Sequence, residues 1–237
     1  MSEPDWGRLT RAAVDRLTVE VYREAWRTRP EVRRIRLLGH EAVVKDYGRA
    51  SNRFKHLLGA FLAMREAAAL RRTDGIACVP RFYALPRPWI LVMEHIEARP
   101  VTALSEDERQ QALTPVFFGA LARLIEQIHA CGVAHGDLEK LDNILITPDG
   151  RPVIVDFAAA VIAGINPLAA LILPQIKAND FRAVYKLKSL YAPHLLTDEE
   201  RGRLHARSRA ESIFRRARSC IRAPMKRWAE GPEDRGV

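Results

Sequence analysis

Three polar side chains suited to phosphoryl transfer lie within residues 133–158 (VAHGDLEKLDNILITPDGRPVIVDFA). Asp137 stands two positions after His135, and a loop carboxylate of this kind can accept the proton of an attacking hydroxyl. Asn143 offers an amide oxygen, and Asp156 offers a second carboxylate directly after an apolar run. Such oxygen ligands can hold Mg²⁺ against the phosphates of a nucleotide. The pattern therefore predicts a site for magnesium-dependent transfer of a phosphoryl group to a hydroxyl.

The elements that must position these residues are a helix and a hairpin. The apolar run 113–131 is followed by Gly132 and predicts a helix that ends just before the polar stretch. Residues 143–147 and 152–156 are predicted to be two strands joined by a Pro-Asp-Gly turn. A hairpin of this kind fixes the separation between the amide and the second carboxylate.

The first part of the chain is predicted to be a small lobe of strands and helices. A helix is expected over residues 8–28 and another over 53–72, with strands over 34–38, 41–47, 79–85 and 89–94. Beyond Asp156 the chain is apolar and then helical. This order predicts an α+β protein with a small lobe at 1–98, a helical lobe at 99–228 and a loose tail at 229–237. A hinge near 94–102 would place a cleft between the lobes.

The order of these motifs resembles the protein-kinase-like superfamily over about residues 35–190. Lys45, in the strand AVVK, stands where the superfamily keeps its phosphate-binding lysine, and Glu66 stands where the ion-pair partner of that lysine lies. Taken singly, they are better interpreted as an edge-strand lysine and a helix-surface acid. Glu94 falls at the hinge, whose backbone usually meets adenine. The resemblance implies ATP and Mg²⁺ as cofactors.

The same resemblance implies roles for the loop residues. Asp137 would orient or deprotonate the acceptor, Lys140 would steady the γ-phosphate, and Asn143 and Asp156 would bind the metal. An alternative register places Asp142 on the metal. His135 is expected to brace the loop through hydrogen bonds.

Asp180 is interpreted either as a buried aspartate that anchors the catalytic loop or as a helix N-cap.

Several departures from conventional protein kinases narrow the resemblance. His-Gly-Asp replaces His-Arg-Asp, Asp-Phe-Ala replaces Asp-Phe-Gly, and no Ala-Pro-Glu segment follows. No glycine-rich GxGxxG loop is visible, and Gly39-His40 is a minimal turn in the expected place of that loop. These features are similar to the bacterial lipopolysaccharide-core (Kdo and heptose) kinases and to RIO-like kinases. Aminoglycoside and choline phosphotransferases also use such a loop. The resemblance implies a bilobal protein-kinase-like fold with a reduced N-terminal β lobe.

We expect an ATP- and Mg²⁺-dependent kinase that acts on a hydroxyl, with the lipopolysaccharide-kinase-like branch favoured. Its acceptor would be a lipopolysaccharide-type sugar or a glycolipid at the inner face of the membrane, and the protein would be cytoplasmic. Two alternatives stay open. One is a minimal protein Ser/Thr kinase, whose acceptor is a protein hydroxyl. The other is a pseudokinase that acts as a binding module.

The net positive charge of the chain is concentrated in one segment near its C-terminal end. The net charge is +9 in 237 residues, and ten Lys/Arg with a single acid within 201–228 account for all of it. Apolar residues fall near one helical face of 203–228, which suits an anionic membrane surface or a helix packed on the lobe. Nucleic acid is disfavoured because no aromatic platform accompanies the charge.

Three further features limit the cellular setting. The run 157–173 carries no charge, but it is short and broken, so burial against the helical lobe is favoured over a membrane span. The three cysteines are widely spaced and contain no CxxC, which argues against a disulfide scaffold or a zinc ribbon and for a reducing compartment. The first residues do not have the pattern of a secretory signal peptide.

Overall fold

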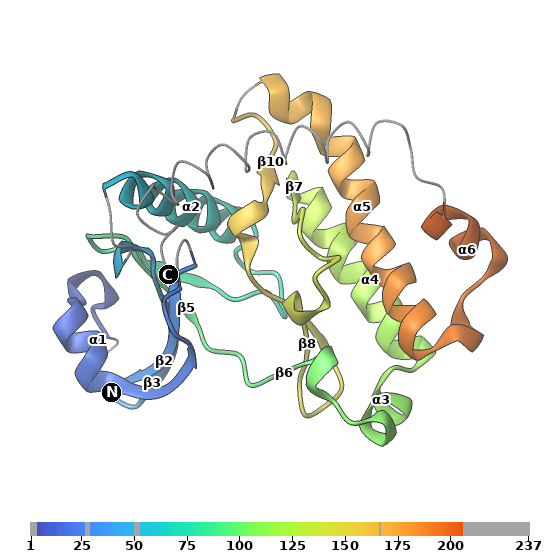
Figure 1. Cartoon of the computed structure of the whole chain (residues 1–237), viewed down its shortest axis with the longest axis horizontal. Helices are drawn as coiled ribbons and strands as arrows, with labels where there is room; N and C mark the ends of the chain where they lie inside the picture. Colours follow the sequence, from blue (N-terminus) through green and yellow to red (C-terminus); the bar gives the residue numbers. More distant parts are fainter. Residues whose placement is uncertain (1–3, 27–28, 50–52, 166, 206–237) are drawn as a thin grey trace, which may run out of the picture.

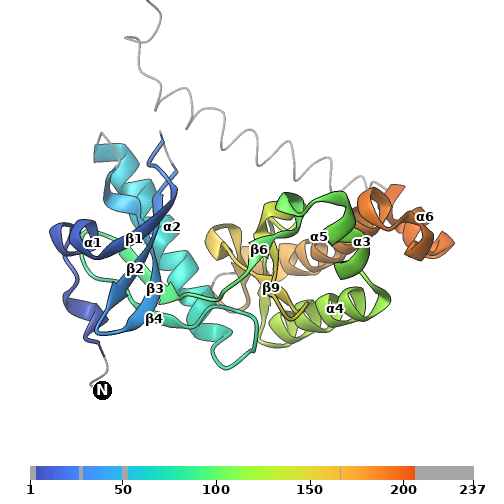
Figure 2. The ribbon, with the colours of Figure 1, turned by 90° about the horizontal axis from the view of Figure 1, so that it is seen from below.

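The computed structural model describes residues 4–26, 29–49, 53–165 and 167–205. A sheet-rich N-terminal half and a helical C-terminal half lie side by side (Figures 1 and 2). This arrangement confirms the predicted α+β fold with a β lobe and a helical lobe. Most of the predicted basic segment 203–228, and the whole of the predicted tail, fall outside the described residues.

The N-terminal half is built on one antiparallel sheet in the order β1-β2-β3-β5-β4. Its strands are β1 (Thr18–Arg23), β2 (Glu31–Leu37), β3 (His40–Asp46), β4 (Phe82–Ala84) and β5 (Ile90–Glu94). Helix α1 (Arg11–Leu17) packs on one face, where Val14 joins a buried apolar cluster with sheet residues such as Ile35 and Val44. Helix α2 (Arg53–Arg72) joins a second and larger cluster, which also holds Leu91 and Met93 of β5.

The predicted helix over 8–28 is wrong beyond Leu17. Thr10 caps α1 by accepting a hydrogen bond from the backbone N–H of Ala13, and the helix ends after seven residues. The next six residues, TVEVYR, form β1 and pair with β2. The apolar spacing fitted a helix, but the β-branched residues in this stretch favour a strand, and β2 supplies a partner that local periodicity does not reveal.

The helical half contains α3 (Glu106–Ala112), α4 (Pro115–Ala130), α5 (Pro167–Tyr191) and α6 (Asp198–His205). Figure 1 shows α4 and α5 side by side. The predicted helix before the polar stretch is confirmed as α4, with Thr114 as its N-cap and Pro115 at its first position. The predicted hairpin is confirmed as β8 (Ile144–Ile146) and β9 (Pro152–Ile154), which form a three-stranded sheet with β6 (Arg99–Pro100).

The uncharged run 157–173 is divided among three elements. It forms the short 3-10 helix η5 (Phe157–Ala159), strand β10 (Val161–Ile162), which pairs with β7 (Val133–Ala134), and the first turns of α5. Phe157, Ile162 and Ala169 are buried, whereas Ile165 and Leu171 are exposed. The predicted burial of this run is therefore correct only in part. Within the described residues, every helix is too short or too polar to span a membrane.

Candidate active site

The junction of the two halves holds a buried cluster of opposite charges. The ammonium Nζ of Lys45, at the end of β3, lies 2.6 Å from Glu66 Oε1 on α2 and 2.9 Å from Asp156 Oδ1 before η5. Lys45 is 6% exposed and Glu66 is fully buried. The structure thus brings together three residues that the sequence motifs had placed in one site.

The opposite charges in this cluster shift the pKa values of Lys45 and Asp156. The positive charge of Lys45 lowers the pKa of Asp156 well below its usual value, against the opposing effect of burial. Burial alone lowers the pKa of Lys45, but Asp156 and Glu66 together raise it above its usual value. Both Lys45 and Asp156 therefore stay charged over the physiological range, which is the state needed to bind phosphates and a metal ion.

Tyr47 is a member of the cluster that the sequence reasoning missed. Its hydroxyl donates a hydrogen bond of 2.5 Å to Glu66 Oε2, so Lys45 and Tyr47 occupy both oxygens of one carboxylate. Burial and the neighbouring Glu66 raise the pKa of Tyr47 well above its usual value. The available signal was its position two residues after Lys45, which is the spacing of neighbours on one face of a strand.

The loop that carries His135, Gly136 and Asp137 is anchored from the middle of α5 by Asp180. The carboxylate of Asp180 accepts hydrogen bonds from the backbone N–H groups of His135 (2.7 Å) and Gly136 (2.9 Å). It also lies 2.9 Å from Nε2 of His129, at the end of α4. Asp180 is 1% exposed and lies inside α5 rather than at its start, so the N-cap alternative is wrong and the anchoring alternative is confirmed.

His135 braces the loop as expected. Its Nε2 lies 2.9 Å from the carbonyl oxygen of Val155, and its Nδ1 accepts a hydrogen bond from the backbone N–H of Asp137 at 3.2 Å. Together these contacts assign the proton to Nε2. The ring is fully buried and joins the residue before Asp156 to the loop that carries Asp137.

Gly136 is required by the path of the loop. Its φ is +75°, and a Cβ at this position would come within 2.9 Å of the carbonyl oxygen of Ala159. An arginine with its side chain on this backbone would be strained and crowded. The glycine of His-Gly-Asp is therefore a local structural requirement.

Asn143 and Asp156 offer oxygens from the two ends of the hairpin. The amide nitrogen of Asn143 donates to the carbonyl oxygen of Asp137 at 3.0 Å, which leaves the amide oxygen as the atom for a metal. Asp156 has φ 70° and ψ 65°, the left-handed conformation that non-glycine residues adopt mostly at turns and functional sites. An amide oxygen and a carboxylate are ligands that Mg²⁺ accepts alongside phosphate oxygens.

Two exposed residues flank this pair. Lys140 lies close enough for its charge to contribute to the lowered pKa of Asp156. Asp142 is exposed and accepts a hydrogen bond of 2.5 Å from the hydroxyl of Thr102, whereas Asn143 is buried. These contacts favour Asn143 over the alternative register with Asp142.

The hinge end of the sheet carries Glu94 and a chain of polar contacts. Glu94 ends β5, and its backbone N–H and its carboxylate both bond to the main chain of Arg81. The next residue, His95, lies 3.1 Å from Glu41 Oε2 through Nδ1 and 3.1 Å from the Tyr22 hydroxyl through Nε2. The sequence reasoning did not find this link between β1, β3 and the hinge.

The turn at Gly39-His40 is not in the place of a phosphate-covering loop. It joins β2 to β3 at the end of β3 opposite Lys45. The cross-strand register instead aligns Arg23 of β1 with Val32 and Lys45. Strand β1 therefore ends at the end of the sheet that carries Lys45, and the sequence 24–30 that follows it contains no glycine.

Comparisons with known proteins agree with this geometry. A five-stranded sheet with a Lys–Glu pair, joined to a helical half that carries the catalytic loop, defines a protein-kinase-like fold. The sequence matches the RIO domain family over residues 18–177, and the chain belongs to that family. Of the groups that the sequence resembled, this match supports the RIO-like kinases, and no comparison supports the lipopolysaccharide-core kinases.

Two solved structures show the same fold. The Rio2 kinase–ADP/Mg²⁺–phosphoaspartate complex from Chaetomium thermophilum is 20% identical, with a TM-score of 0.56, over 79% of this chain and 60% of that chain. A second structure of Rio2 kinase from the same organism is 20% identical, with a TM-score of 0.55, over 79% and 62%. The chain thus spans about three fifths of these proteins. Comparison with curated proteins gave no match.

Proposed function

We propose that this protein is an ATP- and Mg²⁺-dependent kinase that transfers the γ-phosphate to a hydroxyl. The observation that carries the proposal is the buried Lys45–Glu66–Asp156 cluster, which lies beside a catalytic loop fixed by Asp180. A site of this kind aligns phosphates and neutralises their charge, which is most of what phosphoryl transfer requires of a protein.

Each residue has a role that follows from its contacts. Lys45 would bind the ATP phosphates while Glu66 keeps its ammonium in place, and Lys140 would neutralise charge on the γ-phosphate. Asn143 and Asp156 would hold Mg²⁺, which supplies charge neutralisation to the transferring phosphoryl group. The backbone of the hinge near Glu94 would meet the adenine.

Asp137 would orient the acceptor hydroxyl and accept its proton. Its backbone is held from two sides, because its N–H donates to His135 and its carbonyl oxygen accepts from Asn143. This double attachment limits the positions that the carboxylate can reach and supports a catalytic role.

A protein serine or threonine hydroxyl is the acceptor that the family match favours. The RIO domain match and the likeness to Rio2 kinase fit a protein kinase better than a kinase of lipopolysaccharide sugars. The sugar or glycolipid acceptor remains the second candidate, and the basic segment 203–228 is the feature that favours it. A peripheral position at an anionic membrane surface belongs to the same proposal, because it depends on that segment.

The proposal is tested by incubating the full chain with γ-labelled ATP and Mg²⁺ in a cleared lysate and in a glycolipid extract. Asp137→Asn should abolish label transfer, whereas Asp142→Asn, a matched change five positions away on the exposed rim, should retain it. Label on protein supports the protein-kinase reading, and label on glycolipid supports the second candidate. Equal transfer by wild type and Asp137→Asn would contradict the site.

A further inference from the structure

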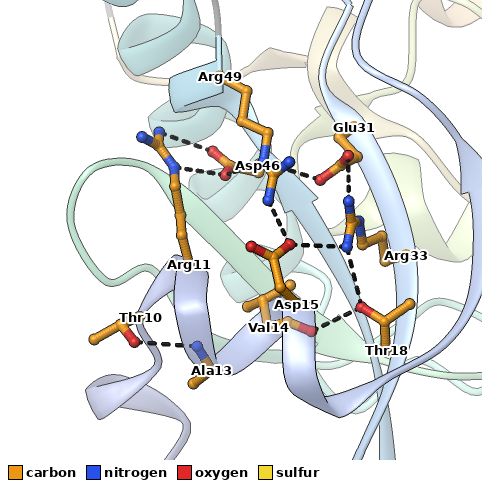
Figure 3. Close-up of polar contacts among 10 residues, drawn as sticks. All are labelled: Thr10, Arg11, Ala13, Val14, Asp15, Thr18, Glu31, Arg33, Asp46 and Arg49. Carbon is orange, nitrogen blue, oxygen red and sulfur yellow. Dashed lines mark hydrogen bonds and ion pairs between the residues drawn. The ribbon is translucent and has the colours of Figure 1, made fainter.

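The sheet face opposite Lys45 carries a closed cluster of three arginines and three acids (Figure 3). Its members are Arg11 and Asp15 of α1, Glu31 and Arg33 of β2, Asp46 at the end of β3, and Arg49 of the short 3-10 helix η2 (Tyr47–Arg49). The two most buried acids are Glu31, 2% exposed, and Asp46, 4% exposed. Glu31 and Asp46 can be buried because the three positive charges of the cluster compensate its three negative charges. Removal of one partner would leave a buried charge uncompensated and would destabilise the fold.

Arg11 makes the contact that joins α1 to the end of the lysine strand. Its Nε donates to Asp46 Oδ2 at 2.7 Å, and its terminal nitrogen donates to Oδ1 at 3.2 Å. This two-pronged geometry fixes orientation as well as distance. Asp46 Oδ1 also accepts from the backbone N–H of Gly48 at 2.8 Å, so the same carboxylate shapes η2.

The rest of the cluster holds α1 against β2 and η2. Asp15 of α1 accepts from Arg33 at 2.9 Å and from Arg49 at 2.5 Å. Arg33 and Arg49 in turn contact Glu31, at 2.7 and 3.2 Å. Figure 3 shows these side chains converging from the helix, the strand and the segment after β3.

The segment η2 lies between α1 on one side and α2 on the other. A Cβ on Gly48 would overlap the guanidinium of Arg11 and the carbonyl oxygen of Pro88, and a Cβ on Gly59 of α2 would come within 2.7 Å of the carbonyl oxygen of Tyr47. The backbone of α2 therefore approaches η2 closely at Gly59, whereas α1 reaches η2 through the side chain of Arg11. A displacement of η2 would be transmitted to α2, because this interface has no room for one more carbon atom.

Three consecutive residues connect the cluster to the candidate active site. Lys45 and Tyr47 both bond to Glu66, whereas Asp46 between them bonds to Arg11 on the opposite face. We infer that Arg11 and Asp46 are positioning residues for the proposed phosphotransfer, because the docking of α1 fixes η2 and so keeps Glu66 on Lys45. The catalytic part of this inference rests on the proposed function.

A double-mutant cycle on kcat/KM for ATP separates positioning from general stability. Arg11→Gln should lower kcat/KM about tenfold well below the melting temperature, since two charge-assisted hydrogen bonds are lost. If Arg11 acts through Glu66, Arg11→Gln should have little further effect in a Glu66→Gln background. Arg11→Lys, which keeps the charge, should recover part of the loss.

The matched control is Arg8→Gln. Arg8 precedes α1, carries the same charge and pairs with Asp5 at the surface, with its side chain 88% exposed. The Arg8→Gln variant should leave kcat/KM unchanged. Additive effects of Arg11→Gln and Glu66→Gln, or a loss of stability with unchanged kcat/KM, would overturn the inference.

Hydrogen exchange tests the same link without reference to catalysis. Arg11→Gln should speed exchange of the α2 amides over residues 59–66, and Arg8→Gln should not. Unchanged exchange in Arg11→Gln would overturn the mechanical link even if the protein is an active kinase. Faster exchange in a protein that transfers no phosphate would instead contradict the proposed function and leave the link standing.

Discussion

Lys45 and Asp156 lie 111 positions apart in the sequence, yet their charged atoms are 2.9 Å apart. This ion pair connects the end of β3 to the segment after β9, and Glu66 completes it from α2 at 2.6 Å. In the proposed site, Lys45 would hold the nucleotide phosphates and Asp156 would hold Mg²⁺. The pair marks the centre of the proposed site.

Removal of the Lys45 ammonium should destabilise the protein as well as inactivate it. Lys45→Met leaves two partly or fully buried carboxylates without their cation, which costs about 3–5 kcal/mol of unfolding free energy. The double variant Lys45→Met/Glu66→Gln should regain part of the lost unfolding free energy, but it should remain inactive. Urea denaturation and a label-transfer assay measure the two effects separately. An equally large loss of stability in the single and double variants would contradict the account of the cluster.

Tyr47 should make the protein sensitive to alkaline pH. The raised pKa of its phenol means that the folded state keeps this proton above pH 10, where the unfolded chain releases it. The native state then binds more protons, so the free energy of unfolding falls as pH rises. Tyr47→Phe should lower stability at pH 7 by about 1.5–3 kcal/mol, through the lost hydrogen bond to Glu66, and flatten the alkaline decline.

Urea denaturation at a series of pH values from 7 to 11 checks this prediction. Parallel alkaline declines in wild type and Tyr47→Phe would show that other groups cause the effect.

Asp180 should control turnover without touching the reactants. Asp180→Asn removes the charged acceptor for two backbone N–H groups, and we expect stability to fall by about 2 kcal/mol. The loop would lose its fixed path, so kcat should fall more than the affinity for ATP. Asn179→Ala, one position earlier on α5, is the matched control. Similar kcat values for Asp180→Asn and the control would argue against loop anchoring.

Gly136 and Gly150 form a natural comparison. Both have positive φ, +75° and +84°, but only Gly136 has an atom within 4 Å of a Cβ placed there. Gly150→Ala should cost about 1 kcal/mol from backbone strain alone. Gly136→Ala should cost more, because Ala159 is in the way, and it should also lower kcat. Thermal unfolding together with kcat measurements on both variants checks the difference, and equal behaviour would contradict it.

The sequence predicted the part of the site that lies in local motifs. Lys45, Glu66, Asn143 and Asp156 each stand in a short pattern on a predicted strand, helix or loop, and the order of those patterns placed them together. The hairpin that carries the proposed metal ligands was found because its turn and its apolar strands are local signals. The structure brings Lys45, Glu66 and Asp156 together in one cluster.

The sequence could not predict contacts that depend on packing. Tyr47 contacts Glu66, 19 positions away in the sequence, and His129 contacts Asp180, 51 positions away. No sequence motif predicts either contact. Strand β1 was mistaken for helix because the spacing of its apolar residues also fits a helix and does not reveal its pairing with β2. The six-residue charge cluster is equally invisible in sequence, since arginines and acids are common throughout the chain.

Calorimetric titration of ATP into the full chain, with and without Mg²⁺, tests the central claim most directly. We predict binding that requires Mg²⁺, that is lost in Asp156→Asn and that is retained in Asp142→Asn. Absence of binding in both conditions, or equal binding by wild type and Asp156→Asn, would contradict the assignment of this junction as a nucleotide and metal site.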